Sequence, residues 1–192
     1  MRRLILASTS PFRKSLLEKL QLRFSCQAPD IDETPNHDES AEALVQRLAQ
    51  AKAEKIGSTT PDALIIGSDQ VAVLNGGIIG KPHTHPRATE QLRACSGQVI
   101  TFYTGLCLHD SNSGKSERIC DLFRVHFRPL SDDQIERYLQ REQPYQCAGS
   151  FMAEGLGISL FKKLEGDDPN TLVGLPLIRL IELLHRQGIE IP

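Results

Sequence analysis

The sequence has no excess of basic residues, no long apolar run and no paired-cysteine motif. Its 192 residues carry a net charge of −2, which argues against a nucleic-acid coat or a membrane-surface protein, because both need a basic excess. No segment approaches the roughly 18 apolar residues of a membrane span. The apolar residues after Met1-Arg2-Arg3 are too few for the apolar region of a signal peptide. We therefore expect neither nucleic acid nor a membrane as a partner.

The five cysteines are odd in number, and no two have the Cys-x-x-Cys spacing. Neither a disulfide framework nor a zinc site is therefore indicated, and reduced thiols in the cytoplasm are the expected state. An apolar content of 40% and a charged content of 24% are ordinary for a globular protein. The length fits one domain covering residues 1–192, with room for two lobes.

A short apolar run directly precedes the most suggestive acidic residue. Ala63–Ile66 is rich in β-branched side chains, which predicts a buried strand. Gly67 and Ser68 interrupt the run, so the sequence predicts that the strand ends there. Asp69 is then expected at a strand end, where its carboxylate can face a cleft.

A tight hairpin is predicted immediately after Asp69. Val71–Leu74 has the pattern of a second strand, and Asn75-Gly76 is typical of a two-residue turn with positive φ. Beyond the hairpin, Lys81 lies on a stiff loop between glycine and proline. Opposite charges on two neighbouring rigid elements suggest an acid near an anionic ligand. The alternative is a surface ion pair of little consequence.

The N-terminus has the pattern of a phosphate-binding turn. Leu4–Ala7 predicts a buried strand, and the hydroxyl cluster Ser8-Thr9-Ser10 leads into a helix that begins at Pro11. Free N–H groups and the helix dipole favour an anion at such a terminus, and Arg13 could add a bidentate grip. The alternative is that Ser10 only caps the helix and Arg13 is solvated.

The segment Pro29–Pro35 is an acidic loop bounded by prolines. Its carboxylates, Asp30, Asp32 and Glu33, repel one another unless they are solvated or bridged by a cation. Magnesium needs few protein carboxylates and takes its remaining ligands from water and phosphate. A solvated loop and a metal site are both compatible with this pattern.

A long helix is expected from Ser40 to about Ile56, with Lys52 near its last turn. A lysine there either complements the negative end of the helix or reaches a ligand. Farther along, Glu154 is the only charge in the small-residue segment Cys147–Gly157, where backbone could approach a ligand closely. Gly166–Thr171 has the pattern of an acidic, turn-rich loop.

The remaining elements predict a mixed α/β sheet in two lobes around a deep cleft, not a regular doubly wound sheet. Two lobes with a cleft between them would bring together Ser8–Arg13, Asp32–Glu33, Lys52, Asp69 and Lys81. The elements on which this prediction depends are a helix at Pro86–Cys95, a long antiparallel hairpin of Val99–His109 and Arg118–Arg128, a helix from Ser131, a strand at Ile158–Phe161 and a last helix at Leu175–Gln187.

Six short motifs follow one another along the chain: Leu6–Arg13, Asp32–Thr34, Ala51–Ala53, Gly67–Gln70, Gly80–Pro82 and Gly166–Pro176. Together, and in this order, they resemble the motifs of the Maf-like nucleoside triphosphate pyrophosphatases over nearly the whole chain. Ser68-Asp69-Gln70 and the stretch from Cys147 to Gly155 resemble the 7-methyl-GTP branch, since the dTTP/UTP branch usually has Ala-Asp-Thr at the first place. Some members carry Glu-Glu where this chain has Asp32-Glu33.

The resemblance implies a fold related to the inosine-triphosphate pyrophosphatases and cleavage between the α- and β-phosphates with a divalent cation, Mg²⁺ or Mn²⁺. Asp69 would be the catalytic residue, either as general base or as a metal ligand that orients the attacking water. Glu33 is the second candidate metal ligand. Ser8, Arg13, Lys52 and Lys81 would bind the phosphates, and Phe12, Gln70 and Glu154 would select the base.

Two other functions fit the same motifs. One is a dTTP/UTP-type house-cleaning pyrophosphatase, and the other is a regulator of cell division that binds nucleotide without turnover. The expected partner is a nucleoside triphosphate, with a homodimer as an option.

Overall fold

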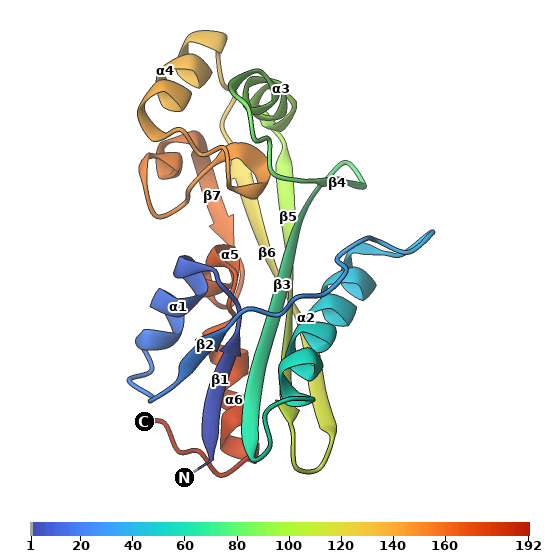
Figure 1. The fold of residues 1–192 in the computed structure, drawn as a ribbon. Coiled ribbons are helices and arrows are strands. Elements are labelled where there is room, and N and C mark those ends of the chain that lie inside the picture. Colours follow the sequence, from blue (N-terminus) through green and yellow to red (C-terminus); the bar gives the residue numbers. More distant parts are fainter. Residues whose placement is uncertain (1) are drawn as a thin grey trace. The chain divides into compact units, whose positions relative to one another are not determined.

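The computed structural model describes residues 2–192 and has the mixed α/β architecture expected from the sequence (Figure 1). The strands of the single sheet are ordered β2-β1-β3-β5-β6-β7, and β4 pairs with β3. The strands are β1 Arg3–Ala7, β2 Ser25–Gln27, β3 Ala63–Leu74, β4 Gly77–Ile79, β5 Val99–Asp110, β6 Lys115–Phe127 and β7 Phe161–Glu165. The α-helices are α1 Pro11–Glu18, α2 Ala41–Gly57, α3 His85–Cys95, α4 Asp132–Glu142, α5 Pro169–Val173 and α6 Leu177–Arg186.

The chain forms two compact units, each built from segments that are separate in sequence. The first unit contains the residues up to Gln70 together with Tyr103–Asp121 and Asp168–Pro192. The second contains Val71–Phe102 and Leu122–Asp167. No helix within residues 2–192 combines the length and the apolar character that crossing a membrane requires.

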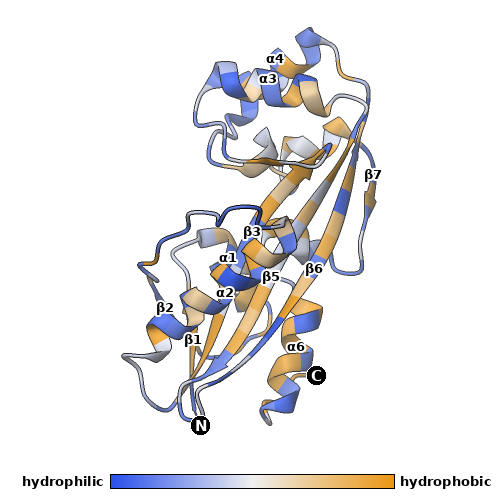
Figure 2. Cartoon of the chain, turned by 90° about the vertical axis from the view of Figure 1, so that its right-hand side faces the viewer, coloured by the Kyte–Doolittle hydropathy of each residue, from blue (hydrophilic) through white to orange (hydrophobic). Residues whose placement is uncertain are grey.

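In the first unit, helices cover both faces of the strands. Alternate residues of a strand point to opposite faces, so each face packs against its own helices. Leu4 and Leu6 of β1 pack in one apolar cluster with residues of α1 and α6. Ile5 and Ala7 pack in a second cluster, with residues of α2. Because both faces are covered, Leu4–Ala7 of β1 and Ala63–Ile66 of β3 are uninterrupted apolar runs. Figure 2 shows this hydrophobic character along the strands and on α6.

Strand β3 continues through Asp69, so the prediction that Asp69 lies at a strand end is wrong. Gly67 does not stop the strand; it lets α2 come close, since a Cβ there would lie 2.0 Å from the Ala49 carbonyl oxygen. Ser68 does not stop it either, because its hydroxyl hydrogen-bonds to carbonyls of neighbouring elements, 2.9 Å from each of Gly105 O and Gly174 O. Asp69 is therefore held in the middle of a twelve-residue strand.

The hairpin predicted after Asp69 is confirmed in the second unit. Asn75 and Gly76 have φ values of 50° and 81°, and β4 runs antiparallel to β3 with Val73 opposite Ile78. The long strands β5 and β6 and the helices α3 and α4 are also found where the sequence predicts them. Ser131 and Gln134 form a capping box at the start of α4.

The strand predicted at Ile158–Phe161 is wrong. Leu156–Leu160 is a 3₁₀ helix, and β7 begins only at Phe161. Gly157 sits against the backbone of Met152, where a Cβ would meet the Met152 carbonyl oxygen at 2.2 Å. The Ser159 hydroxyl donates to the Leu156 carbonyl at 2.8 Å, which closes the turn.

Candidate active site

Lys52 joins two carboxylates that are far apart in sequence. Its Nζ lies 2.6 Å from Oδ1 of Asp69 and 2.8 Å from Oε1 of Glu33. Lys52 and Asp69 are buried, whereas the Glu33 side chain is 56% exposed. One turn of α2 thus brings a cation to the middle of β3 and to the acidic loop at the same time. The sequence prediction that these three residues come together is confirmed.

Burial dominates the protonation of Asp69. Removing the carboxylate from water raises the pKa of Asp69 above its ordinary value, and the ion pair with Lys52 opposes that rise. Arg13 also lowers this pKa and Glu33 raises it, so both lie within electrostatic reach of the same carboxyl group. A carboxylate with a raised pKa is a better proton acceptor than a free aspartate, which suits a general base.

Arg13 is fixed on α1 by a backbone carbonyl. Its Nε donates to the carbonyl oxygen of Gly174 at 2.9 Å, which sets the plane of the guanidinium. Burial lowers the pKa of Arg13, and Asp69 and Glu33 act against that shift. An arginine stays protonated in proteins, so Arg13 adds a second positive charge close to the Lys52 cluster.

Ser8 shapes the turn between β1 and α1. Its hydroxyl is buried and accepts a hydrogen bond from the Ser10 amide at 3.1 Å. Ser10 caps α1 by accepting from the Arg13 amide, as one of the two interpretations of this segment predicted. Because the Ser8 hydroxyl acts as acceptor within the protein, its own proton is available for a phosphate oxygen.

The acidic loop divides its carboxylates between two tasks. Asp32 accepts from the Thr34 amide at 2.9 Å and from the Thr34 hydroxyl at 2.6 Å, so it stabilises the turn of the loop. Glu33 instead pairs with Lys52. Arg47 of α2 donates to the Thr34 carbonyl at 3.1 Å and thereby ties the end of the loop to the helix.

The carboxylates of Asp69 and Glu33 suit a divalent cation only in part. Within residues 2–192 no group of three or more His, Cys, Asp or Glu side chains is placed to hold a metal ion. The two carboxylates both contact the ammonium of Lys52, so in this structure a positive charge already lies between them. Mg²⁺ binds through one or two carboxylates and completes its shell with water and phosphate. Asp69 and Glu33 therefore fit a cation that arrives with a phosphate ligand.

The side-chain amide of Gln70 is fixed by hydrogen bonds within the first unit. Its Nε2 lies 2.9 Å from the Thr104 hydroxyl, 2.8 Å from the Thr171 carbonyl oxygen and 3.3 Å from that of Leu172. Gln70 is predicted to select the base, and in the structure its side chain also holds α5. Phe12, the neighbour of Arg13, is 41% exposed, so it is not a core residue.

Lys81 and Glu154 belong to the second unit, and both are exposed. They act on the same thiol: burial raises the pKa of Cys147, Glu154 raises it further, and Lys81 lowers it. The structure thus brings these two predicted residues near Cys147, although they are far apart in sequence.

Helix α5 and its cap are a part of the first unit that the sequence analysis missed. Asp168, expected in a loop, is buried and accepts from the Asn170 amide at 2.8 Å and from the Ile178 amide at 2.9 Å. It therefore caps α5 and also binds the start of α6. The signal was present in Asp168-Pro169, because an acceptor followed by proline is typical of a helix start.

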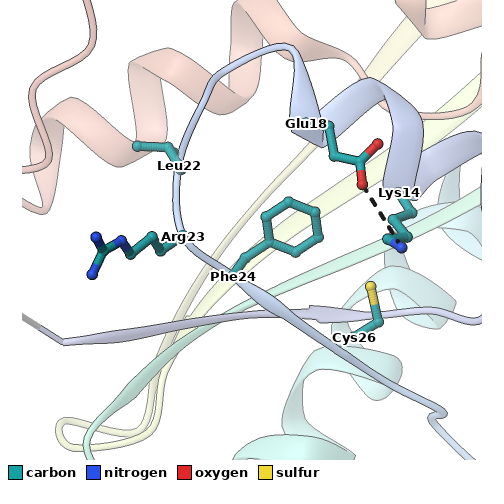
Figure 3. A pocket seen from close by; sticks show the side chains of 6 residues that line it. All are labelled: Lys14, Glu18, Leu22, Arg23, Phe24 and Cys26. Atoms are coloured by element: carbon teal, nitrogen blue, oxygen red, sulfur yellow. Dashed lines mark ion pairs between the residues drawn. The ribbon is translucent and has the colours of Figure 1, made fainter.

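A surface pocket of about 570 Å³ lies beside α1 and β2 (Figure 3). In Figure 3 Lys14 and Glu18 of α1 form an ion pair along its wall, and none of the predicted site residues lines it. It is lined by Lys14, Glu18, Leu22, Arg23, Phe24 and Cys26. We conclude that the chemistry predicted for Asp69 does not take place there.

The model of the Maf-like protein family matches residues 3–187 of the chain. Three similar curated proteins are each named 7-methyl-GTP pyrophosphatase. The protein from Nitrosococcus oceani is 59% identical over 98% of this chain and 94% of its own length. The protein from Colwellia psychrerythraea is 58% identical over 100% and 96%, and that from Vibrio vulnificus is 58% identical over 98% and 96%. Among solved structures, the Staphylococcus aureus Ham1 protein is 12% identical over 67% of this chain and 73% of its own, with a TM-score of 0.46.

Proposed function

This chain belongs to the Maf-like protein family, and on that premise we propose that it is a nucleoside triphosphate pyrophosphatase that hydrolyses 7-methyl-GTP. The observation that carries the proposal is the cluster of Lys52 with Asp69 and Glu33, with Arg13 nearby. The positive charges of Lys52 and Arg13 balance the negative charges of Asp69 and Glu33. The net charge of the site without ligand is therefore close to zero. A triphosphate would replace the carboxylates as the partner of Lys52, which frees Asp69 for chemistry.

In the proposed reaction, water attacks the α-phosphorus. The bond between the α-phosphorus and the oxygen that bridges it to the β-phosphorus breaks, and this oxygen leaves with the diphosphate. The products are 7-methyl-GMP and diphosphate. Asp69 would either accept the proton of the attacking water or serve as a ligand of the divalent cation. Positioning and charge neutralisation supply most of the catalysis in such reactions.

The divalent cation is part of the proposal, with Asp69 and Glu33 as its protein ligands. When bound, it would neutralise charge on the phosphate oxygens. Ser8, Arg13, Lys52 and Lys81 would bind those oxygens by hydrogen bonds and charge. Arginine suits this task because its planar fork matches a phosphate edge.

Selection of the base is assigned to Phe12, Glu154 and Gln70. Methylation at N7 gives guanine a positive charge, and a cationic ring stacks well on an aromatic face such as that of Phe12. Guanine presents N1–H and the 2-amino group as two donors, which one carboxylate can accept together. Glu154 is our candidate for that acceptor. A cytoplasmic location and assembly as a homodimer complete the proposal.

The direct test is turnover by the purified chain. 7-Methyl-GTP, GTP, dTTP and UTP are incubated separately with Mg²⁺ or Mn²⁺, and the monophosphate and diphosphate are measured. We expect 7-methyl-GTP to be hydrolysed with the highest kcat/KM. Preference for dTTP or UTP would identify the house-cleaning alternative, and binding without any product would identify a nucleotide-responsive regulator.

A further inference from the structure

The two neighbours of Asp69 in β3 face away from Lys52 and hold α5. Because strand side chains alternate, Ser68 and Gln70 lie on the face opposite to Asp69. Gln70 donates to the carbonyls of Thr171 and Leu172, near the C-terminal end of α5. The Ser68 hydroxyl lies 2.9 Å from the carbonyl oxygen of Gly174, the residue that ends the same helix. The strand that carries the candidate catalytic carboxylate therefore also fixes the end of α5.

The carbonyl of Gly174 is shared between Ser68 and Arg13. It accepts from Nε of Arg13 at 2.9 Å and faces the Ser68 hydroxyl at the same distance. A carbonyl oxygen has two lone pairs, so these two donors use its capacity. Gly174 has a φ of 113° and ends α5 in the left-handed conformation, which turns its carbonyl out of the helix. Figure 1 shows α1, which carries Arg13, next to α5, and the two helices are in contact.

Helix α5 is also anchored at its N-terminal end and in its middle, so the Gly174 carbonyl at its C-terminal end has a fixed position. The buried Asp168 caps the first turn and binds the start of α6. The hydroxyl of the buried Thr171 donates to Asp121 on β6. Thr104 of β5 donates to the Thr171 carbonyl at 3.1 Å. With the helix so held, the Gly174 carbonyl can orient a long arginine side chain that would otherwise sample many rotamers.

We infer that Ser68 is a positioning residue for Arg13, acting through the carbonyl of Gly174. This inference rests on the proposed function only in taking Arg13 as a phosphate ligand. Ser68 has one proton and two carbonyls within reach, Gly105 and Gly174, so the proton is shared between them. Removing the hydroxyl leaves the Gly174 carbonyl held by Arg13 alone, and the guanidinium loses part of its orientation. A purely structural serine would satisfy the same carbonyls but would have no energetic coupling to Arg13.

A double-mutant cycle distinguishes these two roles. Inorganic tripolyphosphate is the probe, and its Kd is measured by calorimetry for the wild-type chain, Ser68→Ala, Arg13→Ala and the double variant. We expect Ser68→Ala to weaken binding about three- to tenfold in the wild-type background, the scale of one hydrogen bond. In the Arg13→Ala background the same change should alter Kd by less than about twofold, because contacting residues are not additive.

Ser111→Ala is the matched control. The Ser111 hydroxyl also bonds β3, at its opposite end, where it accepts from the Ala63 amide at 2.9 Å and donates to the Ala63 carbonyl at 3.1 Å. We expect no change in Kd from this variant in either background. Should Ser68→Ala fail to fold, Ser68→Cys retains a weak donor of similar shape and should give a smaller loss with the same dependence on Arg13.

An equal loss in both backgrounds, or no loss from Ser68→Ala or Ser68→Cys, would overturn the inference. So would tripolyphosphate binding that is unchanged by Arg13→Ala. Failure of the proposed function has a different signature: the wild-type chain binds tripolyphosphate, with or without the coupling, and yet hydrolyses no nucleotide.

Discussion

The ammonium of Lys52 lies 2.6 Å from the carboxylate of Asp69, and both side chains are buried. A buried ion pair gains Coulomb energy but loses hydration, so it is weak evidence of a stabilising role. Glu33, the second carboxylate paired with Lys52, is largely exposed. The cluster of Lys52, Asp69 and Glu33 is therefore in contact with water on one side. An ion pair that a polyanionic ligand can exchange is the arrangement expected of a phosphate-binding site.

The first prediction concerns pH. Burial raises the pKa of Asp69 above its ordinary value of 3.8, and Lys52 partly opposes this. Since the base must be deprotonated, activity is lost as the pH falls through the raised pKa. We expect the acid limb of the kcat/KM profile to lie above 3.8. In Lys52→Met the opposing charge is gone, so the pKa should rise further, which carboxyl-carbon NMR of labelled aspartate can follow. A pKa of Asp69 that falls in this variant would contradict the assignment.

The second prediction concerns the cations. Changing Arg13, Lys52 or Lys81 to Ala should raise KM for every nucleotide by about tenfold or more, the scale of a charged hydrogen bond. The order of preference among bases should stay unchanged, because the phosphates are common to all. Lys14→Ala is the control, since Lys14 follows Arg13 on α1 but pairs with Glu18 at the separate pocket. A variant that reordered the base preference would show that its residue had been misassigned.

The third prediction concerns the close approach of α2 to β3. The Cβ added by Gly67→Ala would lie 2.0 Å from the Ala49 carbonyl oxygen, so the helix that carries Lys52 has to shift. We expect a loss of about 1–3 kcal/mol in the free energy of unfolding, measured by denaturant titration. Gly80→Ala is the control, because a Cβ there meets nothing within 4 Å. Equal stability of the two variants would show that the contact is not tight.

The fourth prediction concerns the base. Glu154→Gln replaces an acceptor with a donor that would face the guanine N–H groups, and such a mismatch costs on the order of 1–3 kcal/mol. Activity on 7-methyl-GTP should fall by about ten- to a hundredfold while the unfolding midpoint stays close to the wild-type value, since Glu154 is exposed. Phe12→Ala should reduce discrimination between 7-methyl-GTP and GTP. Wild-type selectivity in both variants across a nucleotide panel would place the base site elsewhere.

The local elements of the fold could be predicted from the sequence where one residue type determines the backbone. Asn75-Gly76 predicted the hairpin because both positions need positive φ, and Ser40 and Ser131 predicted the starts of α2 and α4 because they cap them. Gly67 and Ser68 led to a wrong prediction of the strand end, because here these two residues lie within the strand and contact neighbouring elements. The close backbone of α2 and the carbonyl of Gly174 are not visible in the local sequence.

The candidate site was predictable in its members more than in its contacts. Lys52, Glu33 and Asp69 were each identified, but their spacing along the chain does not show that one ammonium binds both carboxylates. The task of Gln70 in holding α5 could not be predicted, because it depends on the carbonyls of Thr171 and Leu172, which are distant in sequence.

The most direct test of the central claim is the turnover of 7-methyl-GTP by Asp69→Asn. Asparagine keeps the shape of the side chain but can neither accept the proton of water nor bring a charge to a cation. Circular dichroism checks that the variant is folded, and binding of tripolyphosphate checks that Arg13 and Lys52 still hold phosphate. We predict that release of 7-methyl-GMP and diphosphate falls by at least about a hundredfold, the usual scale for loss of a general base, while tripolyphosphate still binds. A folded Asp69→Asn variant that hydrolyses 7-methyl-GTP at close to the wild-type rate would contradict the account.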